Sequence, residues 1–252
     1  MFALIIRIVL LGLSVIVLRY ATIPPNPTPI QPRPPPNAPF AHKREWLMVR
    51  LTPMLVSFTR KLVYVSTICE CLFVLRSRYP LLPNFLPQVW MRGGVSLTST
   101  LETARLITLL SGVTAFCIRL RCQNLLGGSF KWHIAGLGEP DEKLLAERPS
   151  KLITTGPYAY IRHPSYAGAL HGYIALTVYY LLPGSWLQES EALYTWTGTL
   201  AVSACVGMWT SFTILYIVLR LDIEEEVLEK QFGEEWKKWS ERVRWRIIPG
   251  VW

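Results

Sequence analysis

Charged residues are scarce in this chain of 252 residues, at 17% of the total, whereas 51% of the residues are apolar. That balance excludes an ordinary cytosolic globule, and it also excludes a disordered, collagen-like or coiled-coil chain. Several apolar stretches are long enough to cross about 30 Å of hydrocarbon. Ten Trp, eleven Tyr and nine Phe accompany them, as is typical of membrane proteins. We therefore predict an all-α, multi-pass transmembrane protein.

Cysteine and histidine are also too few, or unsuitably spaced, to form a disulfide framework or a metal centre. The five cysteines are an odd number without a paired CxxC motif, so we predict neither a disulfide ladder nor a metal centre and interpret them as small buried apolar residues. His163 and His171 lack a third metal ligand, and we predict no metal. The glycines never form GxGxxG, so a soluble dinucleotide-binding fold has no support.

The net charge of +9 comes from 26 Lys and Arg against 17 Asp and Glu. A basic chain can bind nucleic acid, but in a membrane protein the same charge is explained by cytosolic loops that face anionic lipid. We therefore expect the lipid bilayer, and no nucleic acid, among its partners.

The apolar runs predict about five spans, and the other segments connect them. The predicted spans cover residues 2–18, 54–75, 100–120, 166–182 and 193–219. Arg7 interrupts the first span, which lacks a following A-x-A-like cleavage site and so stays attached. Nine prolines between residues 23 and 40 favour an extended spacer. The predicted divisions are a first transmembrane segment (1–20), a proline-rich linker with a basic segment (21–50), a second span with its loop (51–98) and a core domain (99–252).

Polar residues gather in two blocks, 156–166 before the fourth span and 220–226 after the fifth. These two spans form a hairpin, so the blocks reach the same membrane face. Seven basic residues against four acidic ones between Arg119 and Arg162 place that face in the cytosol. Arg220 and Glu224, spaced i,i+4, share one helix face. They form either a self-satisfied ion pair or a site for an anionic substrate beside a cationic cofactor. We predict that residues 220–252 continue the fifth span as an amphipathic helix.

Several motifs follow one another at specific spacing. They are Thr155-Gly156-Pro157-Tyr158, Arg162-His163-Pro164-Ser165-Tyr166-x-Gly168, Arg220-x3-Glu224-Glu225, Phe232-Gly233-Glu234-Glu235-Trp236, and Arg242-Val243 before Pro249. In this order they closely resemble the isoprenylcysteine carboxyl methyltransferase family, over about residues 100–252. The block around His163 together with the glutamate pair is far more specific than either part alone.

The resemblance implies a membrane enzyme, with residues 99–252 as its methyltransferase core. Such an enzyme uses S-adenosyl-L-methionine to methylate the α-carboxylate of a C-terminal S-isoprenylcysteine, in the endoplasmic reticulum membrane with the active site facing the cytosol. Prenylated protein C termini would be its partners. Carried over, the cofactor pocket would be lined by Leu152, Ile153, Tyr158, His163, Pro164, Ser165, Tyr166, Glu224 and Glu225. Arg220 would hold the substrate carboxylate, with Arg162 and Arg242 as further catalytic candidates.

Departures from the family pattern leave other acceptors open. Trp236 and Trp239 stand where the family commonly has tyrosines, so the lipid or peptide side of the pocket could differ. The alternatives are a phospholipid amine or a small lipophilic carboxylate, although Arg220 favours an anionic acceptor. A sterol-type reductase that uses NADPH shares the Arg-His-x-x-Tyr element, but the Gly-Pro-Tyr motif and the glutamate pair argue against it. A non-enzymatic scaffold gives the polar blocks no role.

Overall fold

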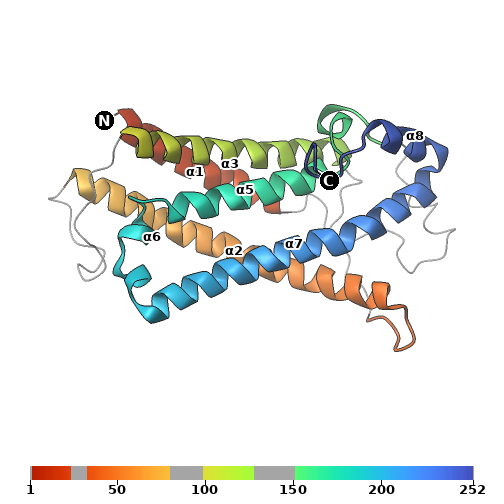
Figure 1. The fold of residues 1–252 in the computed structure, drawn as a ribbon, viewed down its shortest axis with the longest axis horizontal. Coiled ribbons are helices and arrows are strands. Elements are labelled where there is room, and N and C mark those ends of the chain that lie inside the picture. Colours follow the sequence, from red (N-terminus) through yellow and green to blue (C-terminus); the bar gives the residue numbers. More distant parts are fainter. Residues whose placement is uncertain (1, 24–32, 80–98, 128–150, 252) are drawn as a thin grey trace. The chain divides into compact units, whose positions relative to one another are not determined.

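A computed structural model of the chain describes residues 2–23, 33–79, 99–127 and 151–251 (Figure 1). Most of the proline tract, the loop after the second predicted span and the middle of the polar stretch before residue 151 lie outside the described residues. The described secondary structure is entirely helical, which confirms the all-α prediction for this part of the chain.

The described part contains five long helices and four short ones (Figure 1). The long helices are α1 (Phe2–Thr22), α2 (Phe40–Arg78), α3 (Ser99–Leu126), α5 (Pro164–Leu181) and α7 (Trp196–Phe232). The short ones are η3 (Gly156–Ala159), α6 (Trp186–Glu189), η4 (Glu191–Tyr194) and α8 (Glu234–Arg242). A long helix lies at each predicted span, but α2 begins well before residue 54.

Three of the described helices, α1, α3 and α7, are long and apolar enough to cross a membrane, judged by length and composition. The most apolar window of α7 is only 6% buried, and Leu200, Met208 and Leu215 are among its exposed side chains. Such apolar exposure is expected of a helix that faces lipid. The crossing of α2 and α5, and hence the count of five spans, stays a prediction.

The helix that follows the fifth predicted span is not continuous. α7 extends through Arg220 to Phe232, and Gly233 then adopts a φ of +55°, a left-handed conformation that favours glycine. α8 starts directly after it. Trp236 and Trp239 on α8 are buried, whereas Lys238 between them is exposed. The glycine therefore redirects the chain so that two indole rings can pack inward.

The chain divides into two compact units. The first comprises residues 1–19, 58–117 and 169–212. In this unit α3 and α5 approach closely through glycine: a Cβ atom on Gly172 would lie 2.7 Å from the ring of Phe116, and one on Gly112 would lie 3.2 Å from the Cβ of Ala175. Any side chain at Gly172 would overlap the Phe116 ring, so that the ring or a helix would have to shift.

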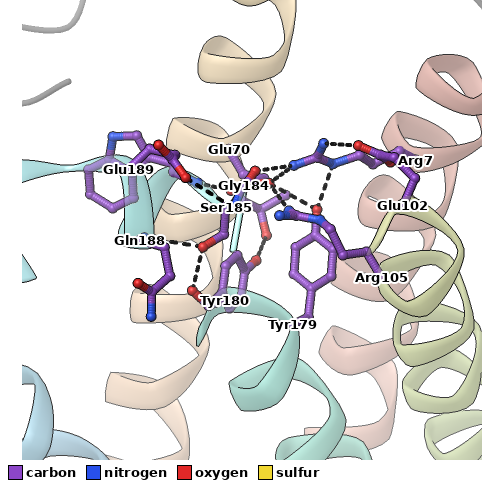
Figure 2. Close-up of polar contacts among 12 residues, drawn as sticks. Arg7, Glu70, Glu102, Arg105, Tyr179, Tyr180, Gly184, Ser185, Gln188 and Glu189 are labelled. Carbon is purple, nitrogen blue, oxygen red and sulfur yellow. Dashed lines mark hydrogen bonds and ion pairs between the residues drawn. The ribbon is translucent and has the colours of Figure 1, made fainter. Parts of the chain in front are cut away.

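The first unit also contains a buried cluster of charges from several helices (Figure 2). Glu70 of α2 is fully buried and forms an ion pair with Arg7 of α1. Its Oε1 also accepts hydrogen bonds from Arg105 Nη2 at 2.6 Å and from the Tyr179 hydroxyl at 3.0 Å, and its Oε2 accepts one from the Trp186 amide at 2.6 Å. Charges inside apolar segments are costly unless they are paired, and this cluster supplies the pairing.

The same cluster fixes the turn after α5 (Figure 2). Arg105 Nη1 donates to the carbonyl of Pro183 at 2.8 Å, and Arg7 Nη2 donates to that of Gly184 at 3.2 Å. These bonds satisfy carbonyl groups of the turn, which have no partner within a helix. The cluster therefore ties α1, α2 and α3 to the end of α5.

The second unit comprises residues 20–57, 118–168 and 213–252. Its apolar core joins the end of α3, the segment around η3, the end of α7 and α8. The buried members are Cys122, Leu152, Tyr158, Phe232, Trp236, Trp239 and Val243. The indole of Trp239 donates to the carbonyl of Tyr158 at 3.3 Å. This core supports the polar site described below.

The five cysteines are free thiols, and they are not uniformly buried. Cys122 is buried as predicted, but the prediction is wrong for Cys117 and Cys205, which are exposed. Both lie on long apolar helices whose outer faces other parts of the described chain leave uncovered. An apolar run in a membrane protein does not distinguish residues that face protein from residues that face lipid.

Candidate functional site

The predicted residues around the start of α5 and in the last part of α7 lie together in the second unit. α5 begins at the buried Pro164, and a proline is favoured in the first turn of a helix because its missing amide costs no hydrogen bond there. Just before it, Arg162 and His163 donate their amides to the carbonyls of Trp245 and Arg246, each at 2.8 Å. The segment after α8 thus fixes the backbone of the predicted site.

Tyr166 and Glu224 meet across α5 and α7. The Tyr166 hydroxyl donates to Glu224 Oε2 at 2.7 Å. The Glu224 side chain remains 29% exposed, so part of it is accessible. The juxtaposition expected from the hairpin is therefore observed for this pair.

His163 is buried and lies between both members of the glutamate pair. Its Nε2 lies 3.1 Å from Glu225 Oε1, and its Nδ1 lies 3.8 Å from Glu224 Oε1. Because an ionised carboxylate only accepts hydrogen bonds, the contact with Glu225 assigns the proton to Nε2.

Glu225 is the centre of a second group of ion pairs. Arg162 Nη1 lies 3.2 Å from Glu225 Oε1, and Arg246 Nη2 donates to Oε2 at 2.8 Å. Arg246 also donates to Asp222 at 2.8 Å. Burial lowers the pKa of the Arg162 guanidinium, partly offset by the attraction of Glu225. Glu225 is thus surrounded by protein donors and largely buried, whereas the Glu224 side chain is partly exposed.

Arg220 is buried in the same unit and has three partners. Its Nη1 donates to the hydroxyl of Tyr216, one turn earlier on α7. Its Nη2 lies 3.6 Å from Glu45 of α2, and its Nε lies 3.8 Å from Glu224. The last two distances are characteristic of ion pairs but exceed those of hydrogen bonds.

The other residues predicted to bind the cofactor lie in two different environments. Leu152 and Tyr158 belong to the apolar core, against which Ile153 packs. Burial raises the pKa of the Tyr158 hydroxyl, which therefore stays neutral. Ser165 instead faces α3, because both its hydroxyl and its carbonyl accept from Arg119 Nη1, at 2.9 and 3.0 Å.

Arg242 is the predicted residue that the structure does not bring into the cluster. Its side chain is exposed on the last turn of α8, with no contact to the glutamate pair in the part of the chain that the structure describes. Arg246, four residues later, contacts Glu225 instead. The chain turns after α8 and brings Arg246 to this position, so a role for Arg242, which the resemblance implies, stays a prediction.

Sequence reasoning also missed Glu45 and Tyr216. Tyr216 could have been found, because it precedes Arg220 by four residues and so shares its helix face. Glu45 carries no such signal, since it lies in a basic, polar segment far from α7 in the sequence.

The site offers both charge signs to a ligand. Three arginines (Arg162, Arg220, Arg246) lie among four carboxylates (Glu45, Asp222, Glu224, Glu225). Among the described residues, the buried N–H groups of Arg162 Nε, Arg220 Nε and Trp236 Nε1 have no acceptor. The cluster can therefore attract a cation to its carboxylates and accept an anionic group at its spare donors.

Residues 107–188 match the model of the isoprenylcysteine carboxyl methyltransferase (ICMT) family. The resemblance predicted from the motifs is confirmed over this segment, which holds His163, Tyr166 and most of α3 and α5. The part of α7 that carries Arg220 and Glu224 lies beyond the ICMT match.

Three fungal proteins are also similar to part of the chain. A Delta(14)-sterol reductase of Neurospora crassa is 30% identical over 122 residues, which are 40% of this chain and 24% of that protein. The Delta(14)-sterol reductase ERG24B of Gibberella zeae is 26% identical over 120 residues, which are 42% of this chain and 25% of that protein. A Delta(14)-sterol reductase of Septoria lycopersici is 30% identical over 111 residues, which are 40% of this chain and 21% of that protein. The match thus spans about a quarter of the length of these relatives. No solved structure matches the chain significantly.

Proposed function

We propose that this protein is an integral-membrane carboxyl O-methyltransferase that uses S-adenosyl-L-methionine to methylate the α-carboxylate of C-terminal S-isoprenylcysteine. The observation that carries the proposal is the buried Arg220, whose Nη2 and Nε lie 3.6 and 3.8 Å from the carboxylates of Glu45 and Glu224, beyond hydrogen-bond distance. The ICMT match over residues 107–188, which include α5, supports it.

The residues present suit a cationic cofactor. S-adenosyl-L-methionine would supply a methyl group on a positively charged sulfur. Glu224, held by the Tyr166 hydroxyl at 2.7 Å, presents a carboxylate of fixed orientation on a partly exposed side chain. Tyr166 and the buried core around Tyr158 add aromatic surface, which also attracts cations.

The acceptor needs binding and orientation more than it needs a base. A C-terminal carboxylate has an unperturbed pKa of about 3.5 and is therefore anionic at neutral pH. The Nε and Nη2 atoms of Arg220 form one edge of its guanidinium, which can hold a carboxylate through two parallel hydrogen bonds. Arg220 would thereby orient the acceptor oxygen, and the surrounding core would exclude water.

The membrane character fits a lipid-modified acceptor. Each buried CH₂ of a prenyl chain contributes about 0.8 kcal/mol to membrane partitioning, so such a substrate resides in the bilayer. The exposed apolar side chains of α7 lie where lipid can contact them. We propose the endoplasmic reticulum membrane as the location, with the site facing the cytosol.

The test is methyl transfer from labelled S-adenosyl-L-methionine to N-acetyl-S-farnesylcysteine, with membranes that contain the full chain. We expect a base-labile methyl ester from the wild type. Glu224→Gln should raise the KM for the cofactor, and Arg220→Ala should raise the KM for the acceptor. Glu226→Gln is the matched control, because that neighbouring glutamate is exposed and pairs with Lys230. Absence of ester despite cofactor binding would reject the proposal.

A membrane sterol reductase is the second candidate, favoured by the similarity to the three Delta(14)-sterol reductases. The carboxylates of the site argue against it, because NADPH is strongly anionic and four acidic side chains surround the arginines. Consumption of NADPH that depends on a Δ14-sterol, in the absence of methyl transfer, would establish the reductase instead.

A further inference from the structure

Residues 243–251, which follow α8, support the candidate site with their backbone. The carbonyls of Trp245 and Arg246 accept hydrogen bonds from the amides of Arg162 and His163, each at 2.8 Å. The side chains of Arg162 and His163 in turn contact the glutamate pair. One side of segment 243–251 therefore belongs to the site, whereas its opposite side has no role in the proposed function.

The opposite side of segment 243–251 exposes apolar side chains around a tight turn. The amide of Val251 donates to the carbonyl of Ile248 at 3.1 Å, with Pro249 and Gly250 between them. Gly250 has a φ of +82°, so that the turn matches type II in both sequence and geometry. Ile248 is 46% exposed and Val251 is 75% exposed, and the indole of Trp245 is also exposed. Apolar side chains gathered in this way indicate a surface that contacts something other than water.

The charges of this segment and of the residue before it have one sign. Residues 242–251 include three arginines and no acidic residue. Arg246 pairs with Glu225. Arg242 and Arg244 are exposed, and neither forms an ion pair with any residue that the structure describes. Two positive charges are therefore available to an anionic partner beside the exposed apolar turn.

The segment lies just beyond the part of α7 that exposes apolar side chains. Val218 is the last exposed large apolar residue of α7. Asp222, one turn later, accepts a hydrogen bond from Arg246 at 2.8 Å. A helix rises about 1.5 Å per residue, which places Asp222 about 6 Å beyond Val218. The headgroup layer adds about 5–8 Å to each side of the hydrocarbon core, so in a bilayer crossed by α7 this segment lies at the depth of the headgroups.

We propose that residues 243–251, with Arg242, form a docking surface for anionic phospholipid headgroups, and that lipid contact stabilises the backbone of the site. The two exposed arginines pair with the headgroups. The indole of Trp245 and the apolar turn enter the boundary between headgroups and acyl chains, which tryptophan favours. Because the other side of the segment holds the amides of Arg162 and His163, lipid contact makes opening of these hydrogen bonds less favourable. This role goes beyond methyl transfer and does not depend on it.

The experiment measures hydrogen–deuterium exchange of the full chain in two kinds of vesicle, one of phosphatidylcholine and one that contains about one third phosphatidylserine. The readout is the exchange rate of the amides of Arg162 and His163, which donate to the segment. We expect slower exchange in the anionic vesicles. The contribution of one arginine near an anionic surface corresponds to about fivefold. Arg244→Gln should therefore exchange about fivefold faster than the wild type in anionic vesicles and at the wild-type rate in phosphatidylcholine.

Two further variants test whether the effect comes from the charge at this position. Arg244→Lys keeps the positive charge and should retain the slow exchange in anionic vesicles. Lys238→Gln is the matched control, because it removes an exposed positive charge from α8 instead. Its exchange rates should equal those of the wild type in both kinds of vesicle.

Three results would overturn this proposal. The first is equal exchange of the wild type in the two kinds of vesicle. The second is an equal effect of Arg244→Gln and Lys238→Gln, because the effect would then come from overall charge. The third is slow exchange that depends on protein concentration and not on phosphatidylserine, which would assign the surface to a second copy of the chain. Exchange is measured without methyl transfer, so the failure of this inference and the failure of the proposed function are distinguishable.

Discussion

The sharpest stability prediction concerns Glu70, the fully buried carboxylate of the first unit (Figure 2). It pairs with Arg7 and Arg105 and accepts further hydrogen bonds from Tyr179 and from the Trp186 amide. Glu70→Gln keeps the shape of the side chain but removes its charge. Two buried guanidinium groups then lose their shared counter-ion, and breaking a buried ion pair in this way costs about 3–5 kcal/mol.

The assay is thermal unfolding of the purified full chain in detergent, followed by a thiol-reactive fluorophore or by circular dichroism. For a chain of this size, that loss corresponds to a fall in Tm of roughly 6–20 °C. Glu102→Gln is the matched control, because Glu102 is 27% exposed and lies 3.5 Å from Arg7. Its Tm should fall by less than about 3 °C. A Glu70 variant that melts with the wild type would refute the claim that the cluster holds these helices together.

Three further predictions follow from single contacts. Gly172→Ala should lower Tm, because overpacking costs about 1–3 kcal/mol, whereas Gly207→Ala, at a position without neighbours within 4 Å, should not. Tyr166→Phe should raise the cofactor KM about tenfold, because loss of a hydrogen bond to a charged group costs at least about 1.5 kcal/mol. The acceptor KM should stay within about twofold of the wild-type value. Equal changes in the two KM values, measured in the methyl-transfer assay, would contradict this prediction. Arg246→Gln should lower kcat/KM about tenfold, because the Glu225 carboxylate loses its hydrogen bond from Arg246. Lys238→Gln, an exposed change, is the control and should give wild-type values in the same assay.

Apolar composition predicts the helices of this chain well where the run is uninterrupted. α3 and α5 were expected at residues 100–120 and 166–182, and they occupy Ser99–Leu126 and Pro164–Leu181. The start of α2 could not be predicted in this way, because four charged residues interrupt the apolar residues of 40–53 and Pro53 lies inside the helix. Contacts with α7, such as that of Arg44, stabilise this part of α2, and tertiary contacts leave no periodic signal in the sequence.

The candidate site shows the same division between local and long-range information. Pairing of Tyr166 with Glu224 could be predicted, because a helical hairpin returns both blocks to one face. The contact of Arg246 with Glu225 could not be predicted, since it depends on how the chain turns after α8. Glu45 could not be predicted either, because its contact with Arg220 joins residues 175 positions apart.

The two polar clusters hold their charges at different distances, and the difference suits different tasks. Glu70 receives direct hydrogen bonds of 2.6 Å from Arg105 and from the Trp186 amide. Around Arg220, the carboxylates of Glu45 and Glu224 lie at 3.6 and 3.8 Å. At these distances the carboxylates still attract the buried guanidinium, but they form no hydrogen bonds with it. An incoming anion can therefore form hydrogen bonds with Arg220 without breaking hydrogen bonds between Arg220 and these two carboxylates. A structural cluster needs the first arrangement, and the proposed function, in which the site takes up and releases a carboxylate, needs the second.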